Sequence, residues 1–303
     1  MNPRLTVITP IFNRKEYLQR LFHCLDKQTC KDFEWIIVDD GSKELLADEI
    51  QEIQRLNECL DYDEDSDLMP RSFALSYYRK PNGGKHTALN LGVTKARGEL
   101  CLILDSDDEL PPKAIETIVG KWSLLSVSQR QELGGMCFYM AHYNGKRIGS
   151  MVLNDVLTDS IDMRYRLRIS GDMCEIFRTD ILRNFFFPVI QQEKFCPEQL
   201  VWFRIAQKYK LKLFNDVVYL RDYLEGGLTN SIVKIRMESP VASCMTYGEM
   251  LEYKDIPFIY KIKAAINYWR FHACLHHAGD TTVEWYWYVF KPVGDIMHLL
   301  DKR

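Results

Sequence analysis

Short apolar runs alternate with amphipathic segments over the first third of the chain, and this alternation constrains the fold more than any other feature of the sequence. The apolar runs are rich in β-branched residues, as is typical of strands buried on both faces; they cover 5–12, 35–38, 73–78 and 100–104. Between them, apolar residues recur at the spacing of a helix face, over 17–25, 45–56 and 87–96. Strands that alternate with helices predict an α/β fold, in which helices flank a mostly parallel sheet.

The pattern changes after Pro111-Pro112. Beyond this point it predicts helices over 114–125 and 198–209, strands over 136–143, 147–153, 174–177 and 211–220, and only helices from about 232, separated by Pro257 and Gly279. We therefore expect 1–112 and 113–228 to be the two halves of one domain, and 229–303 to be a C-terminal helical extension.

Near the start, Asn13 with Glu16 three residues later resembles a capping box, which predicts where the first helix begins.

Charge and cysteine content exclude several classes of protein. The chain has 39 Lys and Arg against 42 Asp and Glu, a net charge of -3, so it lacks the basic field that binding of duplex nucleic acid requires. The nine cysteines are odd in number and contain no C-x-x-C pair, which favours free thiols in a reducing compartment. There is no apolar leader and no run of about 18 apolar residues. We expect a cytoplasmic protein, or one peripheral to the inner face of a membrane.

An acidic turn, Asp105-Ser106-Asp107-Asp108, directly follows the fourth predicted strand. Two carboxylates one residue apart at a strand end, here Asp105 and Asp107, can share a divalent cation that in turn binds diphosphate oxygens. The alternative is an ordinary acidic turn that caps the next helix. D-x-D alone does not decide between the two.

Two more polar segments follow predicted strands. Asp40 lies in Asp39-Asp40-Gly41-Ser42, where a carboxylate can accept hydrogen bonds from a nucleoside. The segment Asn82-Gly83-Gly84-Lys85-His86 opens a helix, and its glycines and lysine suit a phosphate. Each segment alone is also a common turn. Together with the acidic turn, they place base-reading, phosphate-binding and metal-binding groups at the carboxyl ends of strands in one βαβ array.

At these motifs the sequence resembles the family 2 glycosyltransferases of bacterial surface-glycan type, which have the GT-A fold. The resemblance is carried by Val7–Asn13 (VITPIFN), Trp35–Ser42 (WIIVDDGS), Asn82–Gly84 with Ala88–Gly92 (ALNLG), and Leu104–Asp108 (LDSDD). It implies an inverting enzyme in which an acceptor hydroxyl attacks C1 of a nucleotide-sugar, with Mn²⁺ or Mg²⁺ as cofactor. Nucleotide-sugar contacts are implied for Pro10, Phe12, Asn13, Asp40, Asn82, Gly84, Lys85, Asp105 and Ser106, with Asp107 and Asp105 at the metal.

The sequence departs from the family pattern at Leu89. Many members have an arginine at this position, which approaches the diphosphate, and leucine cannot replace its charge. Lys85 on the same loop is the obvious substitute, provided that its side chain does not point to solvent.

The second half of the chain supplies the acceptor side of the implied reaction. Pro197–Arg204 (PEQLVWFR) matches the segment in which family members carry the general base, with Glu198 at the base position and Pro197 where a second carboxylate is usual. The alternative is that Glu198 only stabilises a helix N-terminus. Asp172, in Gly171-Asp172, and Trp202 are predicted acceptor contacts; the alternative for Gly171-Asp172 is an ordinary turn.

The resemblance implies transfer of a single sugar, from a UDP-sugar, to a glycan or lipid-linked acceptor. A sugar-nucleotide pyrophosphorylase is one alternative, although Pro10–Asn13 lacks its Gly-rich signature; an inactive glycan-binding module is another. Segment 257–303 is rich in aromatic residues, including Trp285–Tyr288 (WYWY). This composition is typical of helices that pack into a core, and the alternative is an aromatic belt in contact with lipid headgroups.

Overall fold

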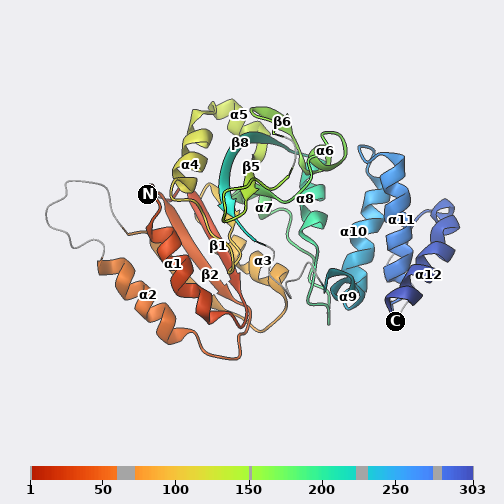
Figure 1. Cartoon of the computed structure of the whole chain (residues 1–303), viewed down its shortest axis with the longest axis horizontal. Coiled ribbons are helices and arrows are strands. Elements are labelled where there is room, and N and C mark those ends of the chain that lie inside the picture. Colours follow the sequence, from red (N-terminus) through yellow and green to blue (C-terminus); the bar gives the residue numbers. More distant parts are fainter. Residues whose placement is uncertain (1, 60–71, 150–151, 223–230, 276–281, 303) are drawn as a thin grey trace.

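The computed structural model describes residues 2–59, 72–149, 152–222, 231–275 and 282–302. Its centre is an eight-stranded sheet in the order β3-β2-β1-β4-β7-β5-β8-β6 (Figure 1). The strands are β1 (Leu5–Ile11), β2 (Phe33–Asp39), β3 (Ala74–Arg79), β4 (Leu100–Ile103), β5 (Leu133–Ala141), β6 (Val156–Thr158), β7 (Met173–Arg178) and β8 (Lys210–Leu220).

Helices cover both faces of this sheet. The helices are α1 (Leu18–Asp26), α2 (Ala47–Cys59), α3 (Lys85–Lys95), α4 (Ala114–Leu124), α5 (Val127–Glu132), α6 (Ser160–Tyr165), α7 (Thr179–Leu182), α8 (Glu198–Ala206), α9 (Ile232–Met237), α10 (Pro240–Glu252), α11 (Phe258–His272) and α12 (Lys291–Asp301), with short 3₁₀ turns η1 (Lys15–Tyr17) and η3 (Trp285–Phe290). One apolar core joins α1, α2 and α4 to the sheet, and a second joins α3 and α8 to its other face. The predicted α/β class with C-terminal helices is confirmed.

Strands β1 to β4 pair in parallel, as the alternating pattern predicts. Leu5 of β1 lies opposite Phe33 of β2 on one side and Leu100 of β4 on the other. This common register brings the carboxyl ends of the strands to one edge of the sheet. The polar segments that follow β1, β2, β3 and β4 therefore converge there.

The second half of the sheet is mixed rather than parallel throughout. Strand β7 lies antiparallel between β4 and β5, β8 is parallel to β5, and the short edge strand β6 is antiparallel to β8. The strand predicted over 147–153 is wrong: within the described residues, this run contributes only an isolated bridge between Arg147 and Ala141. Gly145 and Gly149, with φ of 82° and 91°, bend the backbone out of extended geometry on either side of the bridge.

The capping box predicted at Asn13 is also wrong. Asn13 has a φ of 53°, and the turn η1 separates it from α1. Its side-chain oxygen accepts a hydrogen bond from the Lys43 N–H at 2.8 Å, and its own N–H donates to Ser42 Oγ at 2.9 Å. Asn13 therefore ties the loop after β1 to the loop after β2, both at the edge where the polar segments meet.

The C-terminal helices are anchored to the sheet domain through polar contacts. The Glu193 carboxylate accepts hydrogen bonds from the backbone N–H groups of Val241 at 2.6 Å and Ala242 at 2.9 Å, at the start of α10. Arg204 of α8 pairs with Glu249 of α10. The boundaries predicted near 112 and 228 stay predictions. None of the helices in the described ranges is long and apolar enough to cross a membrane.

Candidate functional site

A cavity of about 540 Å³, here called the first cavity, opens at the carboxyl edge of β1 to β4. Nine of the predicted residues line it: Pro10, Phe12, Asp40, Asn82, Gly84, Lys85, Asp105, Ser106 and Asp107. Asn13 does not, because its side chain holds the neighbouring loop instead. The ring of Phe12 is 44% exposed and offers an apolar surface to a flat ligand.

The Asp40 carboxylate is buried and organises the loop after β3. Its oxygens accept hydrogen bonds from the N–H groups of Gly83 at 2.9 Å and Gly84 at 2.7 Å, and from the Asn82 amide at 3.0 Å. Lys80 adds an ion pair. A carboxylate offers about four acceptor positions, and all are engaged here, so a nucleobase donor would have to share an oxygen with one of these groups.

The conformation of this loop requires glycine at position 84. Gly84 has a φ of 93°, and a Cβ there would lie 1.9 Å from the carbonyl oxygen of Lys194. This close approach packs the loop that carries Asn82 against the segment before α8, and so completes one wall of the first cavity.

Asp107 lines the first cavity and forms an ion pair with Arg14, with Nη1 2.7 Å from Oδ2. Asp105 lines the same cavity, so two carboxylates can present oxygen ligands to one bound group. Such donors suit Mn²⁺ or Mg²⁺, which in nucleotide sites commonly take one or two carboxylates together with phosphate oxygens. The described residues contain no cluster of three or more His, Cys, Asp or Glu side chains that could hold a metal by themselves.

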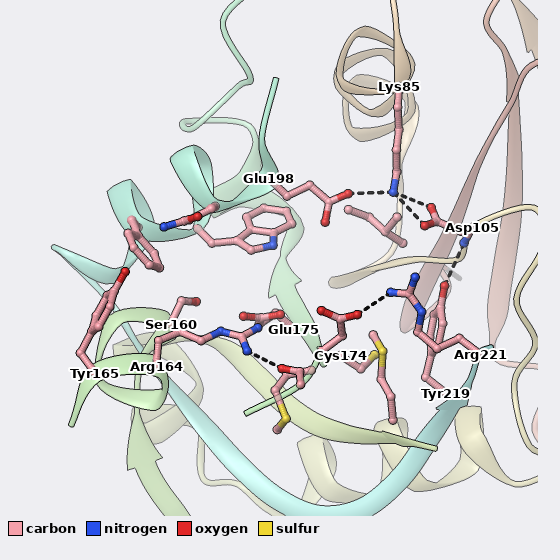
Figure 2. A pocket seen from close by; sticks show the side chains of 18 residues that line it. Lys85, Asp105, Ser160, Arg164, Tyr165, Cys174, Glu175, Glu198, Tyr219 and Arg221 are labelled. Carbon is pink, nitrogen blue, oxygen red and sulfur yellow. Dashed lines mark hydrogen bonds and ion pairs between the residues drawn. The ribbon is translucent and has the colours of Figure 1, made fainter. Parts of the chain in front are cut away.

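A second cavity, of about 520 Å³, lies beside the first, and Lys85, Asp105 and Arg221 line both. Figure 2 shows it between Glu198 on one side and Arg164, Glu175 and Arg221 on the other. The predicted acceptor contacts Asp172 and Trp202 line this cavity together with Glu198. The ring of Tyr165 stands at one end of it (Figure 2), and Phe203 also lines it.

Lys85 does not point to solvent: its ammonium group bridges the two cavities. Its Nζ lies 2.6 Å from Asp105 Oδ1 and 2.8 Å from Glu198 Oε1 (Figure 2). Burial alone would lower the pKa of Lys85, but the two carboxylates outweigh it and hold the pKa above its ordinary value. Conversely, burial would raise the pKa of Asp105, and Lys85 holds it below its ordinary value. Both groups are therefore charged at neutral pH.

Tyr219 and Arg221, which the sequence motifs did not single out, also line the second cavity. Tyr219, in β8, accepts a hydrogen bond from the Asp105 N–H at 3.0 Å and donates one to Asp108 Oδ2 at 2.8 Å. Burial, then the charge of Asp105, raises the pKa of Asp108 to about 7. Arg221 pairs with Asp172 at 2.9 Å. The available signal for Tyr219 and Arg221 was their position, since both lie where the apolar run of β8 ends.

Glu175 also lines the second cavity and was missed. It interrupts the apolar run of β7, and this interruption was the available signal. Burial, opposed by Arg164 and reinforced by the charge of Glu198, raises its pKa to about 7.

The comparisons with known proteins agree with this geometry. The model of the glycosyl transferase family 2 matches residues 6–126. The chain is 28% identical over 213 residues to the GalNAc(5)-diNAcBac-PP-undecaprenol beta-1,3-glucosyltransferase of Campylobacter jejuni, a match that covers 70% of this chain and 62% of the relative. It is 33% identical over 118 residues to the glycosyltransferase GlyG of Streptococcus pneumoniae, covering 39% and 35% of the two chains. The matches thus span less than two thirds of these relatives.

Solved structures resemble the whole fold. TarS 1-349 of S. aureus has a TM-score of 0.59 at 16% identity, covering 99% of this chain and 82% of its own. The mannosyltransferase PcManGT of Pyrobaculum calidifontis, solved with GDP-Man and Mn²⁺, has a TM-score of 0.57 at 16% identity, covering 100% and 89%. At such identities the likeness concerns the fold, which is GT-A. Together with the sheet and its strand-end motifs, the match over 6–126 identifies these residues as a domain of the family 2 glycosyltransferase type.

Proposed function

We propose that the protein transfers a single sugar from a UDP-sugar to a glycan or lipid-linked acceptor, with inversion at C1. The observation that carries the proposal is the position of Lys85, whose ammonium group joins a cavity rich in nucleotide-sugar motifs to the carboxylate of Glu198. The first cavity would hold the nucleoside diphosphate, with Lys85 beside it. The second would hold the sugars.

The reaction needs one base and a charged site for the leaving group. An acceptor hydroxyl would give its proton to Glu198 as its oxygen bonds to C1, while the bond from C1 to the diphosphate oxygen breaks and the nucleoside diphosphate leaves. In the structure, Glu198 is paired with Lys85. A bound diphosphate would compete for Lys85, and Glu198 would then be free to accept the proton.

We also propose that a divalent cation assists departure of the diphosphate. Asp107 would hold it, with Asp105 beside it, and Arg14 would have to release Asp107 first. When bound, the cation would neutralise charge that develops on the leaving group. The oxygen donors of this wall support the proposal, as does the Mn²⁺ with which PcManGT was solved.

The acceptor is proposed from the relatives. The Campylobacter jejuni relative is named for a polyprenyl-diphosphate acceptor, and the enzyme is named a glucosyltransferase. We infer that this chain, too, acts on a lipid-linked oligosaccharide or a growing surface glycan.

The test of the donor is a comparison of nucleotides. We expect UDP to bind at least about 10-fold more tightly than GDP or ADP, because a site built to pair with one base leaves polar atoms unpaired with another. Calorimetry of the three diphosphates with Mn²⁺ measures this, and UDP release from a panel of UDP-sugars with oligosaccharide acceptors measures turnover. Equal affinity for the three would remove the role proposed for Asp40, and binding without turnover would indicate an inactive glycan-binding module.

We propose that the C-terminal helices contact a membrane surface. The aromatic residues of this segment divide into two sets, since Trp269 and Trp287 are buried whereas Trp285 is 79% exposed. More than half of the large apolar side chains that are exposed in the described chain lie on α11, η3 and α12, including Trp285 and Ile296. Lys263 and Lys291 on the same helices suit anionic headgroups.

We expect the protein to float with vesicles that contain phosphatidylglycerol, and much less with neutral vesicles. Replacing Trp285 and Ile296 by serine should release it, because two apolar side chains then leave the headgroup region. Leu124→Ser is the matched control, since Leu124 is 84% exposed on α4, outside this segment. Equal flotation of the double variant and the wild type would count against the contact.

A further inference from the structure

Glu175 is an unusual residue for its position in the sheet. Side chains alternate along β7, so that Cys174 and Ile176 enter one apolar core, while Met173 and Phe177 enter the other. Glu175 lies on the same face as the latter pair, where an apolar residue would pack. A carboxyl group at such a place costs free energy that a hydrogen bond from Ser160 offsets only in part, which suggests that a ligand completes its pairing.

The other carboxylates of the second cavity are already paired. Glu198 and Asp105 share Lys85, and Asp172 pairs with Arg221. Glu175 forms no ion pair with any residue in the described part of the chain. Figure 2 shows it across the cavity from Glu198, with Arg164 and Ser160 of α6 nearby.

The groups that face Glu175 favour its neutral form. Glu198 on α8 opposes a second negative charge, and Arg164 on α6 compensates only in part. The thiol of Cys137, opposite Glu175 in β5, and that of Cys174 are neutral, because burial raises their pKa. Lys85 and Arg221, on the other wall, are held by their own carboxylates. With a pKa of about 7, Glu175 carries its proton for much of the time at neutral pH.

We propose that Glu175 is a specificity-determining residue, which hydrogen-bonds the hydroxyl groups of the acceptor sugar from the side of the second cavity opposite Glu198. This inference rests on the proposed function and deepens it. A neutral carboxyl group both donates and accepts, so it can pair with a sugar hydroxyl in either sense. The rings of Tyr165, Trp202 and Phe203 supply apolar surface for the face of the sugar ring.

The protonation state of Glu175 determines the direction in which sugar binding should change with pH. A sugar that fills the cavity removes the remaining water around Glu175, which penalises the charged form further. Binding should therefore be strong below the pKa of Glu175 and weaken as the pH rises through it. For a pKa of about 7, the neutral fraction falls roughly 10-fold between pH 6 and pH 8.

The test measures sugar binding without turnover. Saturation-transfer NMR with free glucose, galactose, N-acetylglucosamine and N-acetylgalactosamine, at pH 6 and pH 8, covers the common ring substitutions. We expect at least one of them to bind the wild type, roughly 10-fold more weakly at pH 8. Glu175→Gln, which imitates the neutral carboxyl group, should bind it equally at both values of pH. Glu175→Ala should lose about 10-fold in affinity at pH 6.

Asp180→Asn is the matched control, since Asp180 lies in α7, just beyond the end of β7, and its side chain is 60% exposed. It should bind the sugar as the wild type does. Wild-type affinity in Glu175→Ala, an unchanged pH dependence in Glu175→Gln, or no binding of any of the four sugars to the wild type would each overturn the proposal. UDP binding, measured on the same proteins, distinguishes failure of the Glu175 proposal from failure of the proposed function. If the wild type does not bind UDP, the proposed function is contradicted, whether or not a sugar binds.

Discussion

Replacing Glu198 by glutamine is expected to lower the rate of sugar transfer by about 10²–10⁴-fold, the usual contribution of a positioned base. Glutamine keeps the shape of the side chain but cannot take the proton from the acceptor hydroxyl. UDP affinity should stay the same or rise slightly, because Lys85 loses one of its two carboxylate partners and becomes more available to the diphosphate. Steady-state kinetics with saturating donor, together with calorimetry of UDP, measure both effects.

The matched control for Glu198→Gln is Glu252→Gln, an exposed glutamate at the end of α10 that lines neither cavity. It should transfer at the wild-type rate. Near-normal turnover of Glu198→Gln would contradict the assignment, and Asp172, on the same cavity, would then be the next carboxylate to test.

The sequence was most informative where chemistry lies at strand ends. The parallel strands β1 to β4 are adjacent to one another, so their polar segments had to meet at a single edge. Asp40, Asn82, Asp105 and Asp107 line one cavity for this reason. Local pattern and topology sufficed there, because each residue follows its strand directly.

What could not be predicted depends on contacts between distant segments. The motif around Lys85 predicts that its side chain faces a phosphate, whereas its pairing with Glu198 arises only because α8 packs beside the start of α3. Strand β7 lies antiparallel between β4 and β5, and its register against β5 places Glu175 opposite Cys137. A single charged residue in an apolar strand gave no indication, by itself, of which face it occupied. Glu175 was therefore missed.

The second large effect is expected from the proposed divalent cation. Asp107→Asn is expected to weaken UDP binding in Mn²⁺ by at least about 10-fold, or about 1.4 kcal/mol, and to make the affinity the same with Mn²⁺ and with chelator. Asparagine keeps the size of the side chain but removes the charge that a cation requires, and it also releases Arg14 from its ion pair. Arg14→Gln separates the two consequences: it leaves Asp107 charged and without this partner, so its UDP binding should remain dependent on Mn²⁺ or become more so. Calorimetry of UDP with Mn²⁺, and then with chelator, on the wild type and both variants decides the matter. If wild-type affinity were equal in both conditions, Asp107 would serve only as the partner of Arg14, and the cation would have no part in donor binding.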